Sequence, residues 1–183
     1  MNSVAKLLLP ERFDFIFLYQ PESLNNELYQ TFVLNFSAPF IAQFFTKQLQ
    51  AVLPYTDVII GNESEAEAWA NATGLPDVKD LPGIARSIAL LPKSNPSRPR
   101  IVIFTQGAQQ TVVVTSYEPD SPKWYPVEPL TDSQIVDTNA AGDAFAGGFV
   151  GALVTGKNLD ESILAGHASA CVQQVSSRTV DKY

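Results

Sequence analysis

Cysteine and histidine are nearly absent from this sequence. Its 183 residues include one cysteine, Cys171, and one histidine, His167. A single cysteine cannot form a disulfide within the chain, and so small a set of cysteine and histidine cannot supply a structural zinc site. We therefore expect a reducing compartment, the cytoplasm, with the nucleus as a second location.

Long hydrophobic runs and basic residues are also scarce. The longest apolar stretches, 15–19 and 144–154, are shorter than the roughly 18 residues of a membrane-spanning helix. The N-terminus carries a single lysine and a short apolar segment before Pro10, which is poor for a secretory signal. Twelve Lys and Arg against 19 Asp and Glu give a net charge of −7, without the positive field that holds nucleic acid. We expect neither a membrane nor a nucleic-acid partner.

What the sequence does contain is a regular alternation of short β-rich runs and longer helical segments, as in parallel α/β sheets. Hydrophobic residues make up 45% of the chain, enough for one sizeable core. The expected strands are 13–19, 31–35, 57–60, 100–105 and 111–115. The expected helices are 39–53, 64–72, 84–91, 141–154 and 160–175. Residues 106–110 should form a hairpin-like connection, and the proline-rich segment 118–129 should not be regular throughout.

The stretch 136–149 is the most informative for chemistry. An expected strand ends in Asp137 and Thr138, small residues follow, and a helix then begins. The first N–H groups of a helix have no acceptor within the helix, and small side chains let an anion approach them. Asp143 falls in the first turn, where the helix dipole favours a charged carboxylate that can act as a base. On the pattern alone, a helix cap with small packing residues is an equally good interpretation.

A resemblance decides between these interpretations. The segment Asp-Thr-Asn-Ala-Ala-Gly-Asp at 137–143, followed by Ala-Phe-x-Gly-Gly-Phe, resembles the C-terminal signature of the ribokinase-like (PfkB-type) sugar and nucleoside kinases. Four further segments resemble the adenosine kinases within that family; they are 34–41, 61–66, 101–107 and 165–168. The resemblance extends from about Thr31 to about Val175.

The resemblance implies a three-layer α/β ribokinase-like fold that is incomplete here: the C-terminal portion of a mostly parallel sheet with flanking helices. The kinase domain would occupy residues 29–178, and residues 1–28 match the family poorly. The implied reaction transfers the γ-phosphate of ATP to the 5′-hydroxyl of adenosine. Asp143 would be the base, and the N–H groups of Ala140, Ala141, Gly142 and Asp143 would form an anion hole for the transferred group.

The resemblance also implies cofactor sites. Asn62 and Glu65 match a motif that helps to place Mg²⁺ and the ATP phosphates, although an asparagine cap with a glutamate three residues later is also an ordinary helix start. Thr105 and Gly107 would border the nucleotide, but a Thr-Gln-Gly segment is also ordinary turn chemistry.

Three further residues receive weaker assignments from the resemblance. Asp137 and Asn139 match positions near a monovalent cation and the nucleotide. His167 would border the adenine of ATP, although a lone histidine is more often a packing residue.

Two features depart from the family. Adenosine kinases usually have glycine where this chain has Ala140, and family members are considerably longer, with an N-terminal part that carries most of the nucleoside pocket. The chain is therefore interpreted as a truncated form or an incomplete gene model. Two functions stay open: an adenosine kinase, or a catalytically silent nucleotide-binding fragment without the acceptor pocket.

Overall fold

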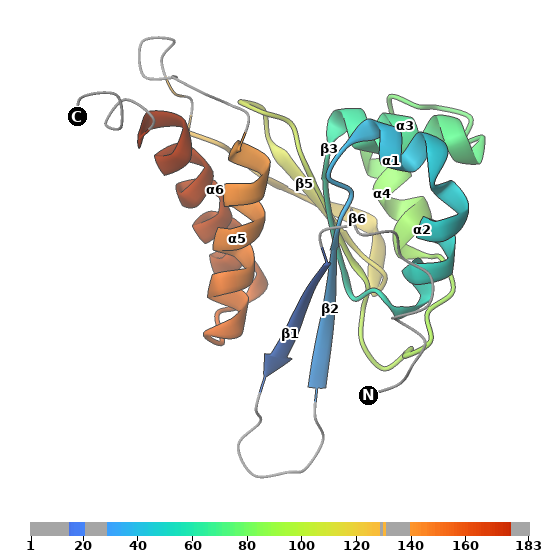
Figure 1. The fold of residues 1–183 in the computed structure, drawn as a ribbon, viewed down its shortest axis with the longest axis horizontal. Helices are drawn as coiled ribbons and strands as arrows, with labels where there is room; N and C mark the ends of the chain where they lie inside the picture. The colour runs from blue at the N-terminus through green and yellow to red at the C-terminus, as the bar shows by residue number, and fades with distance from the viewer. Residues whose placement is uncertain (1–14, 21–28, 129, 131–139, 177–183) are drawn as a thin grey trace.

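A computed structural model describes residues 15–20, 29–128, 130 and 140–176, and the structural statements below concern these residues. The strands form one sheet in chain order (Figure 1). They are β1 (Phe15–Gln20), β2 (Tyr29–Asn35), β3 (Val58–Asn62), β4 (Ile101–Thr105), β5 (Thr111–Thr115) and β6 (Glu118–Tyr125). Strands β2, β3 and β4 are parallel to one another, while the pairs β1–β2, β4–β5 and β5–β6 are antiparallel.

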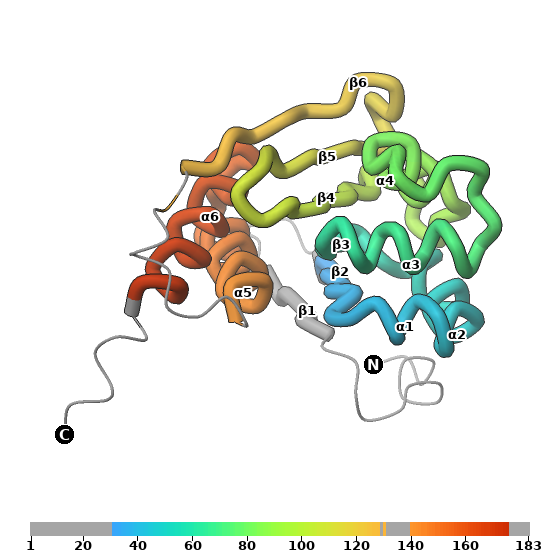
Figure 2. Tube along the Cα trace, turned by 90° about the horizontal axis from the view of Figure 1, so that it is seen from above, coloured from blue at the N-terminus to red at the C-terminus, as the bar shows by residue number. Residues whose placement is uncertain are grey.

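Helices cover both faces of this sheet, so the described residues form three layers (Figures 1 and 2). One face carries α1 (Pro39–Phe44), α2 (Thr46–Val52), the 3₁₀ turn η1 (Leu53–Tyr55), α3 (Glu63–Thr73) and α4 (Leu81–Ala89). The other face carries α5 (Ala141–Val154) and α6 (Leu159–Ser176).

The central strands contribute to a hydrophobic core on each face. In β4, Val102 and Phe104 pack with α1–α4, while Ile103 packs with α5 and α6. Side chains alternate between the two faces of a strand, and a strand covered on both faces is apolar at every central position. The continuous run Ile-Val-Ile-Phe in β4 is the sequence form of this double burial.

Helices α5 and α6 approach each other closely through two glycines. A Cβ at Gly148 would lie 2.6 Å from the carbonyl oxygen of Ala165, and a Cβ at Gly166 would lie 2.8 Å from the Phe145 ring. No larger side chain fits at either position without displacement of a helix. The small residues of α5 and α6 therefore let the two helices pack closely.

A buried charged cluster lies at the beginnings of β3 and β4. The guanidinium of Arg100, which is fully buried, donates hydrogen bonds to the carbonyl oxygens of Leu53 (2.6 Å), Leu91 (2.5 Å) and Pro92 (2.9 Å), among others. The Asp57 carboxylate accepts hydrogen bonds from Lys93 (2.6 Å) and from the backbone of β2. Burial lowers the pKa of Arg100, and the charge of Asp57 opposes this effect.

The predicted strands and helices are present with shifted ends, except that the helix expected over 39–53 is divided. The backbone leaves the helical conformation at Phe45, where φ is −121°, and α2 begins at the next residue. The hydroxyl of Thr46 donates a hydrogen bond to the carbonyl oxygen of Ala42 (2.6 Å). Such local bonds compete with the helical ladder, so this threonine favours a break that apolar periodicity does not reveal.

The proline-rich segment is regular only in part, as predicted, but it contributes a strand that was not expected. Residues 118–125 form β6, with Pro119 and Pro122 inside it and a register shift in its pairing with β5, and residues 126–128 form no helix or strand. Because β6 lies at an edge of the sheet, one of its sides makes no ladder bonds and tolerates proline. The sheet is also mixed rather than mostly parallel, because short connections such as 106–110 can join only antiparallel neighbours.

No helix among the described residues is long and apolar enough to cross a membrane.

Candidate active site

Most of the predicted site residues that the structure describes gather beyond the carboxyl ends of β3 and β4. These strands are parallel, and Asn62 at the end of β3 is paired with Thr105 at the end of β4. The hydroxyl of Thr105 lies 3.4 Å from the carbonyl oxygen of Gly61, its hydrogen-bond acceptor. In open α/β sheets this edge is the usual position of ligands.

Asn62 and Glu65 form a reciprocal cap at the start of α3. The Asn62 side-chain oxygen accepts a hydrogen bond from the Glu65 backbone (2.9 Å), and the Glu65 carboxylate accepts one from the Asn62 backbone (3.0 Å). The Asn62 amide also donates to the second carboxylate oxygen of Glu65 (3.1 Å). The structural interpretation of this motif is therefore confirmed, and it leaves room for a ligand role only in addition to the cap.

Glu65 is a buried carboxyl group with an unusual pKa. Burial raises its pKa from 4.5 to about 7, the backbone hydrogen bond from Asn62 opposes the shift, and the charges of Glu63 and Asp143 add to it. Asp143 therefore lies within electrostatic reach of Glu65, although the two belong to helices on opposite faces of the sheet. A Cβ at Gly61 would lie 3.0 Å from the Glu65 carboxylate, so glycine makes space for this side chain.

The N-terminus of α5 presents backbone donors next to a carboxylate. Ala140 occupies the cap position without a side-chain cap, and its carbonyl oxygen accepts a hydrogen bond from the Ala144 backbone (2.9 Å). The N–H groups of Ala141, Gly142 and Asp143 precede the first intrahelical bond and are open to an anion by position. Asp143 is exposed, and a Cβ at Gly142 would meet no described atom within 4 Å.

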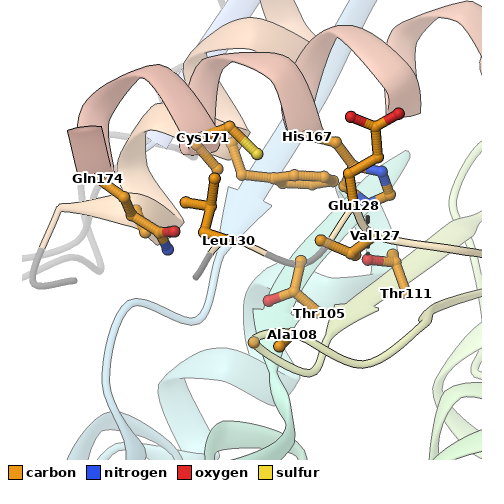
Figure 3. A pocket seen from close by; sticks show the side chains of 14 residues that line it. Thr105, Ala108, Thr111, Val127, Glu128, Leu130, His167, Cys171 and Gln174 are labelled. Carbon is orange, nitrogen blue, oxygen red and sulfur yellow. Dashed lines mark hydrogen bonds between the residues drawn. The ribbon is translucent and has the colours of Figure 1, made fainter. Parts of the chain in front are cut away.

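A cavity of about 200 Å³ lies beside this helix end, between the sheet and the layer of α5 and α6 (Figure 3). Five predicted residues line it: Thr105, Gly107, Ala141, Gly142 and His167. Gly107 has a φ of +55°, a conformation that glycine adopts at no steric cost. Asn62, Glu65, Ala140 and Asp143 do not line the cavity itself.

The remaining cavity walls were not predicted from the sequence. They come from Ala108, Thr111, Val127, Glu128, Leu130, Phe145, Ala170, Cys171 and Gln174. These residues belong to five separate segments, and their types are those of ordinary core and surface positions. The helical period could have identified part of one wall, because Ala170 and Cys171 lie one turn beyond His167 on α6 and Gln174 lies two turns beyond it.

His167 is engaged by residues of two other elements. Its Nε2 atom lies 2.9 Å from the hydroxyl of Thr111 on β5, within hydrogen-bond distance. Its ring centroid lies 5.5 Å from that of Phe145 on α5. Burial lowers the pKa of His167, which favours the neutral imidazole. His167 therefore packs against the fold and lines the cavity at the same time.

Asp137 and Asn139, the residues assigned to a monovalent cation and the nucleotide, lie outside the described residues. Their roles stay predictions.

Comparisons with known proteins agree on the family. The pfkB family carbohydrate kinase model matches residues 22–181. Adenosine kinase of Schizophyllum commune is 59% identical over 146 residues, which are 79% of this chain and 42% of that protein. The crystal structure of Anopheles gambiae adenosine kinase in complex with P1,P4-di(adenosine-5) tetraphosphate superposes with a TM-score of 0.78 at 40% identity, and covers 81% of this chain and 43% of its own.

A second solved structure is similar. Adenosine kinase from Schistosoma mansoni in complex with adenosine and AMP gives a TM-score of 0.72 at 36% identity, over 79% of this chain and 41% of its own. The chain thus spans about two fifths of the length of the relatives that it matches. The matched part has the ribokinase-like α/β fold, and the chain belongs to the pfkB family of carbohydrate kinases.

Proposed function

We propose that this chain belongs to an adenosine kinase and carries the part that binds ATP and supplies the catalytic base. The reaction would transfer the γ-phosphate of ATP to the 5′-hydroxyl of adenosine and give AMP, with ADP as the leaving group. The observation that carries the proposal is the position of Asp143. It is an exposed carboxylate in the first turn of α5, directly after two cavity-lining residues whose N–H groups are open to an anion.

Each group at this helix end has a distinct role in the proposed step. Asp143 accepts the proton of the 5′-hydroxyl as the oxygen attacks phosphorus. The N–H groups of Ala141, Gly142 and Asp143 stabilise the negative charge on the transferred group. Such positioned donors are effective because they are fixed before the reaction begins. Ala140 has a φ of −104°, a conformation open to any residue, so its alanine imposes no strain where the family usually has glycine.

The cavity is suited to the base of ATP. Its lining is largely apolar, with Val127, Leu130 and Phe145 among its walls and the hydroxyls of Thr105 and Thr111 as polar groups. Nucleotide pockets commonly combine apolar walls with a few polar groups that orient the ligand. Its position beside the N-terminus of α5 supports a binding mode in which the phosphates lie next to the proposed anion hole.

The residues present fit Mg²⁺ through water rather than by direct ligation. Both carboxylate oxygens of Glu65 are already hydrogen-bonded to Asn62, and Mg²⁺ usually keeps several of its waters. Together with Asp143, Glu65 forms an acidic edge that a divalent cation would neutralise. When bound, the ion would offset the charge of the phosphates. The monovalent cation assigned through Asp137 stays a prediction.

Adenosine is the proposed acceptor because relatives similar to this chain are adenosine kinases. This chain covers 42% of the Schizophyllum protein, and the family resemblance assigns most of the nucleoside pocket to a part of the enzyme that this chain does not match. A nucleotide-binding fragment without transfer is therefore the competing outcome.

The test is transfer of labelled γ-phosphate from ATP to adenosine by the purified chain. We expect Asp143→Asn to lower transfer by about 10²–10⁴-fold, the usual contribution of a general base. Asp120→Asn, which changes an exposed carboxylate on β6, should leave transfer unchanged. Full activity of Asp143→Asn would contradict the assignment of the base. A folded chain that binds ATP without any transfer would favour the silent fragment.

A further inference from the structure

Among the described residues, two side-chain hydrogen bonds join α6 to the strands β5 and β6. One joins His167 on α6 to Thr111 on β5, and the other joins Asp160 on α6 to Tyr125 on β6. Thr111 and Tyr125 are paired in the β5–β6 register, so both bonds start from the same level of the sheet. They differ in surroundings, because Thr111 and His167 line the cavity whereas Tyr125 and Asp160 do not.

The bond inside the cavity is anchored on its sheet side. Thr111 is fully buried, and its described side-chain hydrogen bond is the one with His167. A buried hydroxyl strongly favours the geometry in which its hydrogen bond is made, because an unpaired polar group cannot turn to water. Thr111 therefore defines where the imidazole must lie.

The same imidazole is anchored on its helix side. The ring of Phe145, which is buried on α5, packs against His167 and also fills the space that Gly166 leaves open. Phe145 follows Asp143 by two residues on the same helix. A displacement of His167 would therefore shift Phe145 and, with it, the N-terminus of α5, where the proposed base and anion hole are located.

We infer that the Thr111–His167 pair is a latch that sets the width of the cavity between the sheet and the helical layer. This inference rests on the proposed nucleotide site and assigns His167 a positioning role, through Thr111 and Phe145, in place of direct recognition of the base. The latch holds the cavity at the width that the nucleotide needs, so its loss weakens nucleotide binding without unfolding the chain.

Variants of the full 183-residue chain test the latch from both sides. Thr111→Val keeps the shape of the buried side chain and removes the hydroxyl. His167→Leu removes the imidazole, and His167→Gln restores an amide group near the position of Nε2. Tyr125→Phe is the matched control, because it breaks the other hydrogen bond between α6 and the sheet outside the cavity. Far-UV circular dichroism establishes that each variant is folded.

The first readout is the dissociation constant of Mg-ATP. We expect Thr111→Val and His167→Leu each to weaken binding by about tenfold, the upper range for one hydrogen bond. The double variant should bind no more weakly than either single one, because both changes break the same bond. His167→Gln should recover most of the affinity, and Tyr125→Phe should bind as the unchanged chain does. Additive losses, or an equal loss in Tyr125→Phe, would overturn the latch.

The second readout needs no nucleotide binding. Cys171, the one cysteine of the chain, lines the same cavity, so its rate of reaction with an aromatic disulfide reports how open the cavity is. Thr111→Val and His167→Leu should react several-fold faster than the unchanged chain, and Tyr125→Phe should not. Equal rates in all four proteins would overturn the latch. If ATP did not slow the reaction of Cys171 in the unchanged chain, the result would count against the proposed function. The comparison of reaction rates among the variants would still test the latch.

Discussion

Buried charged side chains are paired differently at the two ends of strands β3 and β4. At their beginnings, Arg100 is surrounded by carbonyl oxygens and Asp57 is paired with Lys93, so each charged group has several partners. At their carboxyl ends, the described hydrogen bonds to the buried Glu65 carboxylate come from Asn62, and Glu65 lies within electrostatic reach of another acid, Asp143. The end where the charges are paired stabilises the fold, and the end where two acids lie close to each other is the candidate site.

The largest effect should come from the end where the charges are paired. Arg100→Met would leave a group of buried carbonyl oxygens without their donor and would remove the favourable charge of Arg100 near Asp57, which keeps its pairing with Lys93. We expect a loss of roughly 3–5 kcal/mol in the free energy of unfolding, measured by urea denaturation, because removal of one partner from a buried charged network is severe. Arg86→Met is the control: Arg86 is exposed and paired with Asp120, and its loss should cost less than about 1 kcal/mol.

The next largest effect concerns Glu65 and depends on pH. Its pKa is about 7 in the folded chain against 4.5 for the ordinary group, so the folded state holds the proton more tightly. This contribution to stability is complete below pH 4.5 and is lost as the pH rises to about 7. We expect the unfolding free energy of the unchanged chain, relative to Glu65→Gln, to fall by on the order of 2 kcal/mol across this range. A difference independent of pH would show that Glu65 is not the titrating group.

A smaller effect separates two glycines. Gly61→Ala would bring a Cβ to 3.0 Å from the Glu65 carboxylate and 3.2 Å from the Phe104 ring, and should cost about 1–3 kcal/mol in unfolding free energy. Gly151→Ala on α5 meets no described atom within 4 Å and should stabilise the chain by about 0.5–1 kcal/mol. If both substitutions changed the unfolding free energy in the same direction, the predicted crowding around Gly61 at the end of β3 would be contradicted.

Sequence patterns predicted the elements well and their contacts poorly. The run at 100–105 was predicted as a strand, and β4 occupies Ile101–Thr105; its burial on both faces explains the succession of apolar residues. The division of the helix at Phe45 and the strand through Pro119 and Pro122 were not predicted, since both depend on local hydrogen bonds and on the position of β6 at an edge.

The candidate site shows the same division. Asp143 and its small neighbours could be identified from the resemblance because they are contiguous, whereas the approach of Asp143 to Glu65 depends on how the two helical layers meet at the sheet. No sequence pattern indicated that Thr111 lines the cavity, because a threonine in a β-branched strand is ordinary. Only the fold brings it next to His167.

The prolines of β6 also determine at which edge of the sheet another strand can pair. Pro119 and Pro122 lack N–H donors, and exposed Glu118, Asp120 and Lys123 surround them, so the outer side of β6 is a poor template for another strand. Among the described residues, β1 pairs with β2 on one side only. Any strand that joins this sheet, from the same polypeptide or another, must therefore add at β1, and extension is one-sided.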